Sequence, residues 1–375
     1  MMKLHQILLG SLVWLVWSCQ GNAQESAYHA QAVADSDSVQ RITLLFAGDM
    51  MQHMPQINAA RQKGGTYDYA LCFEHVRERI SRADLAVTNL EVTLAGAPYS
   101  GYPQFCAPDA FLEAIKGAGF DLIMTANNHS ADKGRKGIER TIDQLDRLGL
   151  PHFGTYKDAA AREAQYPLVV EKNGFRLVML NYTYGTNGLP VPKPNIVNLI
   201  DREQMAADIA KAKTMQPDAI FACMHWGEEY QLVPSKEQTE LADWLFEQGV
   251  THIIGGHPHV VQHVEVRTDA EGAKHLLAYS LGNYISNQSR PNTDGGMTVE
   301  MTLEKKGGKT QLADCDYYLT WVARPPVSGR RNYVVYPTSY PQDKLNSRER
   351  GLMKTFTTNA RALFKERNKG IEERE

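Results

Sequence analysis

The stretch RITLLFAGDM, residues 41–50, begins the pattern from which the fold is predicted. Its apolar run is typical of a buried strand, and it stops on Gly48 and Asp49. Taken alone, this Asp also fits a simple turn cap. Comparable runs, nearly all ending in Asp, Glu, Asn or His, follow at residues 83–92, 120–128, 175–184, 218–227, 250–260, 274–285 and 296–305.

Amphipathic helices are predicted between these strands. Alternation of short β-rich runs with such helices is the pattern of a layered α/β domain. The helices are indicated by apolar residues that recur at helical spacing and so share one face. These stripes lie at residues 73–80, 138–148, 205–212 and 241–246.

The polar residues at the strand ends are expected to meet, because ligands of open α/β sheets bind beyond the carboxyl ends of the strands. Asn89 and Glu91 are two residues apart and so lie on one side of an extended chain. A Glu buried there needs a cation or hydrogen bonds. His257 and His259 are also two apart and follow two glycines that leave room for close backbone approach.

Further side chains able to bind metal come from the other strand ends. Residues 126–132, ANNHSAD, hold more of them than turn chemistry explains. His225 directly ends the run AIFACM, with Glu228 close behind, and Asn283 ends another strand. The lone His53 is more typical of a structural residue. Carboxylate, amide and imidazole groups without thiolate favour one or two ions of Mn, Fe, Zn or Mg, suited to hydrolysis or transfer at a phosphoryl or acyl centre.

Composition excludes several classes of protein. The 375 residues include 43 acidic and 40 basic side chains, giving a net charge of −3, and 43% are hydrophobic. These values exclude a disordered chain, a collagen and a polytopic membrane protein. Without a basic run or a surplus of positive charge, no nucleic-acid partner is expected.

The N-terminus predicts export. A positively charged start precedes an apolar stretch at residues 7–17, which is too short to span a bilayer comfortably. Residues 1–18 are therefore predicted to be a signal peptide, and Cys19 to carry the lipid of a membrane-anchored lipoprotein facing the periplasm or the cell exterior. Plain secretion is the alternative. Residues 19–40 are polar and aperiodic, and they predict a flexible tether.

Residues 41–325 are predicted to form one domain, and residues 326–375 a C-terminal extension. The extension ends in a helix with one apolar face, which a single helix cannot bury by itself. We therefore expect this helix to pack on the domain. In an exported protein Cys72 and Cys106 could pair, but their irregular spacing and the large core favour free buried thiols.

The strand-end motifs together resemble the CapA family, the poly-γ-glutamate capsule biosynthesis proteins whose PGA_cap domain belongs to the calcineurin-like metallophosphatase superfamily. The resemblance covers roughly residues 42–290. It implies a four-layer α-β-β-α sandwich, with two mixed sheets face to face and helices outside, and an extracytoplasmic location. It rests on the ordered segments AGDMM, TNLEVTLAG, ANNHSADKG, MHWGEEY, GGHPHVVQ and YSLGNYI.

The resemblance also implies roles for the strand-end residues. His129 with Asp132 matches an acid or substrate-orienting pair. Asn89, Glu228 and Asn283 are expected as polar contacts around the centre. The expected metal ligands are Asp49, Glu91, Asn128, His225, His257 and His259.

Two positions depart from the superfamily pattern. Met51 stands where that pattern has a metal-binding His. The second motif supplies Glu91 where the superfamily has a bridging Asp. One tightly bound and one weakly bound metal is the resulting expectation.

The leading hypothesis is an extracytoplasmic, metal-dependent enzyme or assembly factor of poly-γ-glutamate capsule biosynthesis or export, working with other capsule-synthesis components. One alternative keeps the site but acts as a phosphoesterase or amide hydrolase on a small envelope metabolite. Another is a non-catalytic, polymer-binding lipoprotein. Lys133, Arg135 and Lys136 could meet an anionic chain, although a solvated helix start explains them at least as well.

Overall fold

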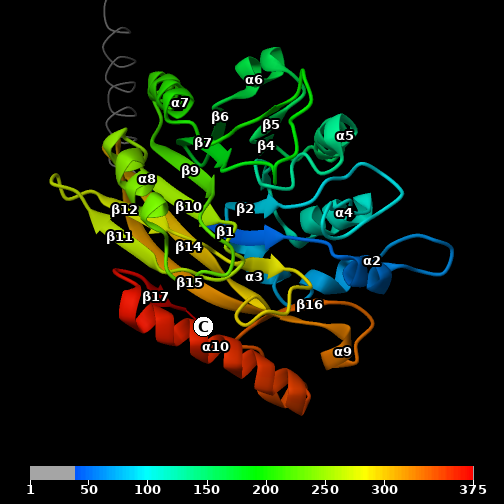
Figure 1. Ribbon diagram of the computed structural model, residues 1–375. Coiled ribbons are helices and arrows are strands. Elements are labelled where there is room, and N and C mark those ends of the chain that lie inside the picture. The colour runs from blue at the N-terminus through cyan, green and yellow to red at the C-terminus, as the bar shows by residue number, and fades with distance from the viewer. Residues whose placement is uncertain (1–38, 375) are drawn as a thin grey trace, which may run out of the picture.

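The computed structural model describes residues 39–374 and contains two large mixed sheets (Figure 1). The first has the order β16-β15-β14-β1-β2-β3-β4, with β13 beside β1 and β17 beside β15. Its strands are β1 (Gln40–Met50), β2 (Leu85–Leu90), β3 (Leu122–Met124), β4 (His152–Phe153), β13 (Asn283–Ile285), β14 (Gly295–Lys306), β15 (Lys309–Ala323), β16 (Val334–Pro337) and β17 (Glu372–Glu373).

The second sheet has the order β11-β12-β10-β9-β7-β6. Its four central strands run parallel, and an antiparallel strand closes each edge. The strands are β6 (Leu168–Lys172), β7 (Phe175–Thr183), β9 (Ala219–His225), β10 (His252–Gly256), β11 (Val264–Thr268) and β12 (Lys274–Ala278).

The two sheets pack face to face. Phe46 of β1 and Phe221 of β9 meet across the interface with ring centroids 5.5 Å apart. Both central sheets are buried on two faces, which explains why their strands are nearly continuous apolar runs. Within β1, for example, Leu44 and Phe46 enter the core between the sheets, while Leu45 enters the core beneath the outer helices.

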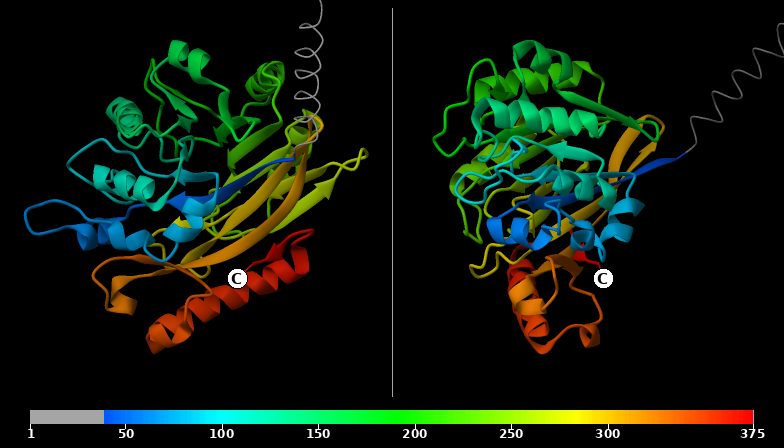
Figure 2. Two further views of the ribbon diagram at one scale, coloured as in Figure 1. Left: turned by 180° about the vertical axis from the view of Figure 1, so that it is seen from behind. Right: turned by 90° about the vertical axis from the view of Figure 1, so that its right-hand side faces the viewer.

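Helices cover the outer face of each sheet (Figure 2). Helices α3 (Arg77–Arg82) and α4 (Asp109–Ala118) pack on the first sheet, and α7 (Arg202–Thr214) and α8 (Lys236–Glu247) on the second. This confirms the predicted four-layer α-β-β-α sandwich. The stripe at residues 73–80 is split between a short 3-10 helix and α3, and α5 (Gly134–Arg147) begins slightly earlier than its stripe suggested.

The apolar run at residues 274–285 is not one strand. Its first part is β12 of the second sheet, and its last part is β13 of the first sheet. The chain crosses between the sheets at Gly282, whose carbonyl oxygen accepts a hydrogen bond from the Asp49 backbone at 3.0 Å. This crossing brings Asn283 to the end of β1, next to the strand ends of the second sheet.

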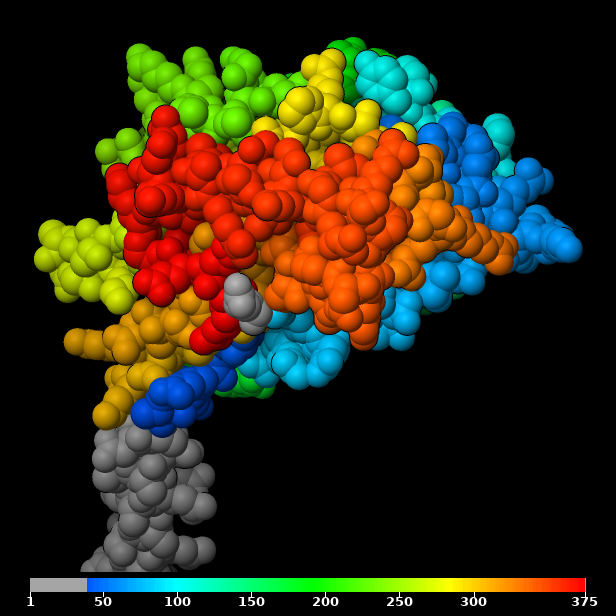
Figure 3. Space-filling view, turned by 90° about the horizontal axis from the view of Figure 1, so that it is seen from below, coloured from blue at the N-terminus to red at the C-terminus, as the bar shows by residue number. Residues whose placement is uncertain are grey.

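The C-terminal segment is integrated into the sandwich. Strand β16 pairs with β15, and α10 (Ser347–Arg367) adds Phe356 and Phe364 to the core between the sheets. Figure 3 shows α10, in red, lying across the orange β15–β16 region. The helix covers the inner face of β15 and β16, where Trp321 and Tyr336 are buried.

Cys72, Cys106 and Cys223 are buried free thiols, as expected. Among the described residues, no helix is both long and apolar enough to cross a membrane. The predicted signal peptide and Cys19 lie outside the described residues, as does the predicted tether except for its last two residues. Of these, Gln40 already belongs to β1.

Candidate metal centre

Asp49 ends β1 and lies fully buried where the two sheets meet. Its Oδ1 atom accepts a hydrogen bond from Asn89 Nδ2 at 2.8 Å, and its Oδ2 atom lies 3.4 Å from Nδ1 of His259. Although burial acts to raise the pKa of Asp49, the hydrogen bonds from His259 and Asn89 hold it well below its usual range. Asp49 is therefore a fixed buried carboxylate.

Glu91 follows β2 directly, and its backbone N–H donates to the Met50 carbonyl at 3.1 Å. Its side chain is fully buried, and neither carboxylate oxygen has a hydrogen-bond partner among the described residues. Burial raises the pKa of Glu91 well above its usual range, and the negative charge of Asp49 adds to the effect. A carboxylate in this setting requires a proton or a cation.

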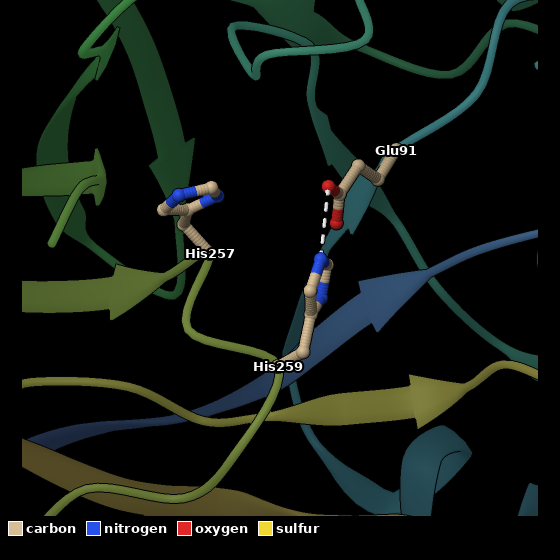
Figure 4. A group of neighbouring side chains, drawn as sticks. All are labelled: Glu91, His257 and His259. Atoms are coloured by element: carbon tan, nitrogen blue, oxygen red, sulfur yellow. Dashed lines mark ion pairs between the residues drawn. The ribbon is translucent and has the colours of Figure 1, made fainter. Parts of the chain in front are cut away.

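Two histidines face the same carboxylate. Oε1 of Glu91 lies 3.6 Å from Nε2 of His225 and 3.9 Å from Nε2 of His259. Figure 4 shows the imidazole of His259 directed at Glu91, with His257 beside the same space. Nδ1 of His257 is buried without a hydrogen-bond partner. Three imidazoles thus surround one unpartnered carboxylate.

The backbone of the His-Pro-His segment is strained, which is typical of functional sites. His257 has φ 100° and His259 has φ 58°. Gly256 permits this turn to approach Asp49, because a Cβ atom there would lie 3.0 Å from Asp49 Oδ1. The glycine is therefore needed for close approach of the two strand ends.

His225 ends β9 and contacts Asn128 from the other sheet. Its Nε2 atom lies 2.9 Å from Oδ1 of Asn128, and burial lowers the pKa of His225 to about 3. The imidazole is therefore neutral at neutral pH, the form that binds metals. Asn128 Nδ2 donates to Oδ1 of Asn187 at 3.2 Å, which directs the oxygen of the Asn128 amide towards His225.

His129 and Asp132 form a buried pair beside this cluster. Nδ1 of His129 lies 2.8 Å from Oδ2 of Asp132, which also accepts a hydrogen bond from the Phe105 backbone N–H at 2.6 Å. The His129 ring meets the Phe105 ring edge to face at 4.5 Å. The imidazole is thus held by a carboxylate on one side and an aromatic ring on the other.

Asn89 and Asn283 orient other members of the cluster. Oδ1 of Asn283 lies 3.1 Å from Nδ1 of His259, while Asn89 contacts both Asp49 and His225. Glu228 instead lies exposed, and no hydrogen bond or ion pair joins its side chain to this cluster in the described part of the chain. The neighbouring Glu229 has more influence on the cluster than Glu228, because the negative charge of Glu229 contributes to the raised pKa of Glu91.

Sequence reasoning missed other residues near the site. The pKa of His53 is lowered to about 4 by burial and, in part, by the charges of His259 and His129, so this His is close to the cluster. Asn187, which accepts a hydrogen bond from Asn128, is another such residue. Met51 packs in the core under the outer helices. His53, two residues after Met51, is the histidine of this segment that lies near the cluster.

Arg135 is one of the basic residues that follow the loop at residues 126–132. It forms an exposed ion pair with Glu139 one turn along α5, at 2.8 Å. This contact fits the solvated helix start.

The donor set fits a divalent cation. Ligand atoms of Asp49, Glu91 and His225 all lie within 4.8 Å of one another, and the same holds for Glu91, His257 and His259. Glu91 belongs to both groups. A cation bound there would stabilise its two unpartnered carboxylate oxygens. Oxygen and imidazole donors suit Mn, Fe or Zn, and the carboxylates also suit Mg.

Comparison with known proteins identifies a family. Residues 43–288 match the model described as "Bacterial capsule synthesis protein PGA_cap". The chain is 28% identical over 281 residues to "Capsule biosynthesis protein CapA" of Bacillus anthracis, covering 72% of this chain and 65% of that protein. It is 27% identical over 211 residues to "PGA biosynthesis protein CapA" of Bacillus subtilis (strain 168), covering 55% and 53%. The chain thus spans less than two thirds of either relative.

Among solved structures, the calcineurin-like phosphoesterase YfkN from Bacillus subtilis is similar at 14% identity, with a TM-score of 0.44 over 88% of this chain and 99% of that one. The family model, by contrast, matches more than half of the sequence and includes every residue of the cluster. The chain therefore belongs to the bacterial capsule synthesis protein PGA_cap family.

Proposed function

We propose that this chain is a metal-dependent hydrolase or transferase in the biosynthesis or export of a poly-γ-glutamate capsule. The observation that carries the proposal is Glu91, a buried carboxylate without a hydrogen-bond partner that is shared by two groups of metal-binding side chains. Family membership supports the capsule assignment.

Asp49, Glu91, His225, His257 and His259 would hold the metal, with Asn128 beside His225. One or two bound divalent ions would supply a Lewis acid and lower the pKa of a water molecule. Glu91, which belongs to both groups, would be the ligand that they have in common, and Asn89 and Asn283 hold Asp49 and His259 in position.

His129 would hold or donate a proton at its Nε2 atom. Its other ring nitrogen faces Asp132, and this contact fixes the ring orientation. The Phe105 backbone N–H occupies the same oxygen of Asp132, so the carboxylate itself is fixed. Under this proposal, the pair would act as the acid that protonates a leaving group.

The substrate under this proposal is the amide-linked anionic polymer, and a small phosphorylated or amide compound is the alternative. Metal content of the purified full chain, measured by mass spectrometry after incubation with Mn, Fe, Zn or Mg, tests the centre. Hydrolysis of a γ-linked glutamate oligomer and of bis(p-nitrophenyl) phosphate tests the two substrate classes. If the protein binds none of these metals and the double variant His257→Ala, His259→Ala is unchanged in function, the metalloenzyme proposal is wrong.

We also propose that the protein is exported and anchored by a lipid on Cys19, where it would meet other capsule-synthesis components. This rests on the sequence of the N-terminus. Cell fractionation of Cys19→Ala is expected to find the protein released from membranes. An unchanged membrane fraction would refute lipid anchoring, and release of the wild-type protein into the medium would indicate secretion.

A further inference from the structure

Tyr230 is fixed beside the His-Pro-His segment. Its backbone N–H donates to the Pro258 carbonyl at 2.8 Å, and its own φ is 69°, in the left-handed region. The ring centroid lies 6.2 Å from that of His259. A backbone contact therefore sets where this ring stands relative to the candidate metal centre.

Arg290 lies over the ring of Tyr230. The guanidinium carbon is 4.2 Å from the ring centroid, within the range of a cation–π interaction. Arg290 is exposed, and no described carboxylate lies within ion-pair distance of it. An aromatic face orients the guanidinium but leaves its N–H donors available to a planar oxyanion.

The loop that carries Arg290 is tied to the metal-site residues. Asn283 Nδ2 donates to Gln288 Oε1 and to the Thr293 carbonyl, both at 2.9 Å. The same side chain contacts His259 through its oxygen. The Arg290 carbonyl in turn accepts a hydrogen bond from the Thr293 N–H at 3.2 Å. One Asn thus fixes both the histidine and the loop beside it.

The carboxylates of the centre have no lysine or arginine of the described residues as a partner. Asp49 and Glu91 carry the buried carboxylates, and no Lys or Arg of the described chain forms a hydrogen bond or ion pair with either. Burial raises the pKa of Tyr230 to about 12, and an interaction with Glu229 adds to this rise, so Glu229 also lies nearby. Arg290 is therefore a cationic side chain that the fold holds, through Tyr230, beside the candidate metal centre.

We propose that Arg290, held by Tyr230, binds an oxyanion of the substrate outside the reacting atoms and so determines specificity. The oxyanion is a carboxylate or a phosphate, since both match a guanidinium in geometry. This inference rests on the proposed function, because it takes the cluster around Glu91 as the reaction centre. Under the polyglutamate proposal, the group is the free carboxylate of a residue next to the bond that reacts.

The test compares Arg290→Gln with Arg41→Gln in the full, metal-loaded chain. Arg41 is also an exposed arginine, but it lies eight residues before Asp49 on β1, about 26 Å away. Titration calorimetry would measure binding of a γ-linked glutamate hexamer, of the same hexamer with methyl-esterified carboxylates, and of inorganic phosphate. Metal content of each variant is measured in parallel.

Arg290→Gln is expected to weaken binding of the free-acid hexamer at least tenfold, to leave the ester unaffected and to keep the metal content. Arg41→Gln should bind as the wild type does. If the wild type binds phosphate but not the hexamer, and Arg290→Gln loses phosphate, the oxyanion role holds while the polyglutamate proposal fails. The inference would be overturned if Arg290→Gln bound the hexamer and phosphate each as tightly as the wild type does. It would also be overturned if the wild type bound neither probe.

Discussion

Oε1 of Glu91 lies 3.6 Å from Nε2 of His225, and neither oxygen of Glu91 has a hydrogen-bond partner among the described residues. The two side chains come from different sheets, because Glu91 follows β2 and His225 ends β9. Their approach is a consequence of the face-to-face packing that aligns the strand ends. A buried carboxylate facing neutral imidazoles is unstable unless a proton or a cation joins them.

Glu91→Gln removes this charge and keeps the shape of the side chain. We expect metal affinity to fall at least about tenfold, because a shared ligand loses its charge. The metal-free variant should melt at a higher temperature than the metal-free wild type. The raised pKa of Glu91 means that the wild type must take up a proton there when it folds at neutral pH, and Gln needs none. Metal titration and calorimetry after chelation measure the two effects.

Glu240→Gln on α8 is the matched control, since Glu240 forms only an exposed ion pair with Lys236. It should change neither quantity. Equal metal affinity in Glu91→Gln and Glu240→Gln would show that Glu91 is not a ligand.

Asn187→Gly tests the residue that holds Asn128. Asn187 has φ 53°, so glycine keeps the backbone conformation while removing the amide that accepts from Asn128. Metal affinity is expected to fall about tenfold, as for loss of a residue that orients a ligand. Asn173→Gly is the control, because Asn173 has φ 51° in the exposed turn between β6 and β7. The prediction fails if both variants bind metal as the wild type does.

His129→Gln tests the buried pair. We expect kcat on a hydrolysed substrate to fall about 100-fold or more, with metal content unchanged, because a positioned proton donor is removed. Asp132→Asn should lower kcat less, because the proton donor stays in place while the carboxylate that orients its ring is lost. Steady-state kinetics across pH provides the measurement. A parallel loss of metal in His129→Gln would assign this His to the metal centre instead.

The sequence predicts most of the cluster because each member ends an apolar strand. Asp49, His225 and His257 stand at such points, and parallel strands bring their carboxyl ends to one edge. Contacts between loops cannot be predicted from the positions of strand ends. Asn187 and Arg290 reach the site through segments whose course depends on the finished fold, so spacing in the sequence carries no signal for them.

Two differences from the sequence-based expectations have a local physical cause. Gly227, with φ 85°, turns the chain after β9, and Glu228 lies exposed beyond this turn, while the charge of Glu229 acts on Glu91. Strand β15 was not predicted because its first half, KTQLADCD, is largely polar and only partly buried. Periodicity identifies a strand only where its faces are covered.

His252 makes the free energy of unfolding depend on pH. Burial lowers its pKa to about 3, and its Nδ1 atom accepts a hydrogen bond from the Leu276 N–H at 3.0 Å. The unfolded chain takes up the proton near pH 6.5, so this stability is present above that pH and is lost as pH falls towards 3. One such group contributes a slope of up to about 1.4 kcal/mol per pH unit.

His252→Asn keeps an oxygen able to accept from Leu276 but does not titrate. Urea unfolding of the metal-free proteins at about pH 7 and about pH 4.5 should show a smaller loss of stability in this variant than in the wild type. If both proteins lose the same free energy of unfolding between these pH values, His252 does not account for the slope.

Gly48 makes the junction between the sheets possible. A Cβ atom there would lie 2.0 Å from the Gly282 carbonyl oxygen, which is backbone and cannot turn aside, and this oxygen accepts the Asp49 N–H. Gly48→Ala is therefore expected to lower the free energy of unfolding by about 3 kcal/mol or more and to displace Asp49, weakening metal binding.

Gly117→Ala is the matched control, because Gly117 lies in α4 with open space around its Cβ position. It should instead stabilise the protein by roughly 0.5–1 kcal/mol. Urea unfolding and metal titration of both variants check these signs; a Gly48→Ala protein as stable as Gly117→Ala would mean that the strand end is free to move away from Gly282.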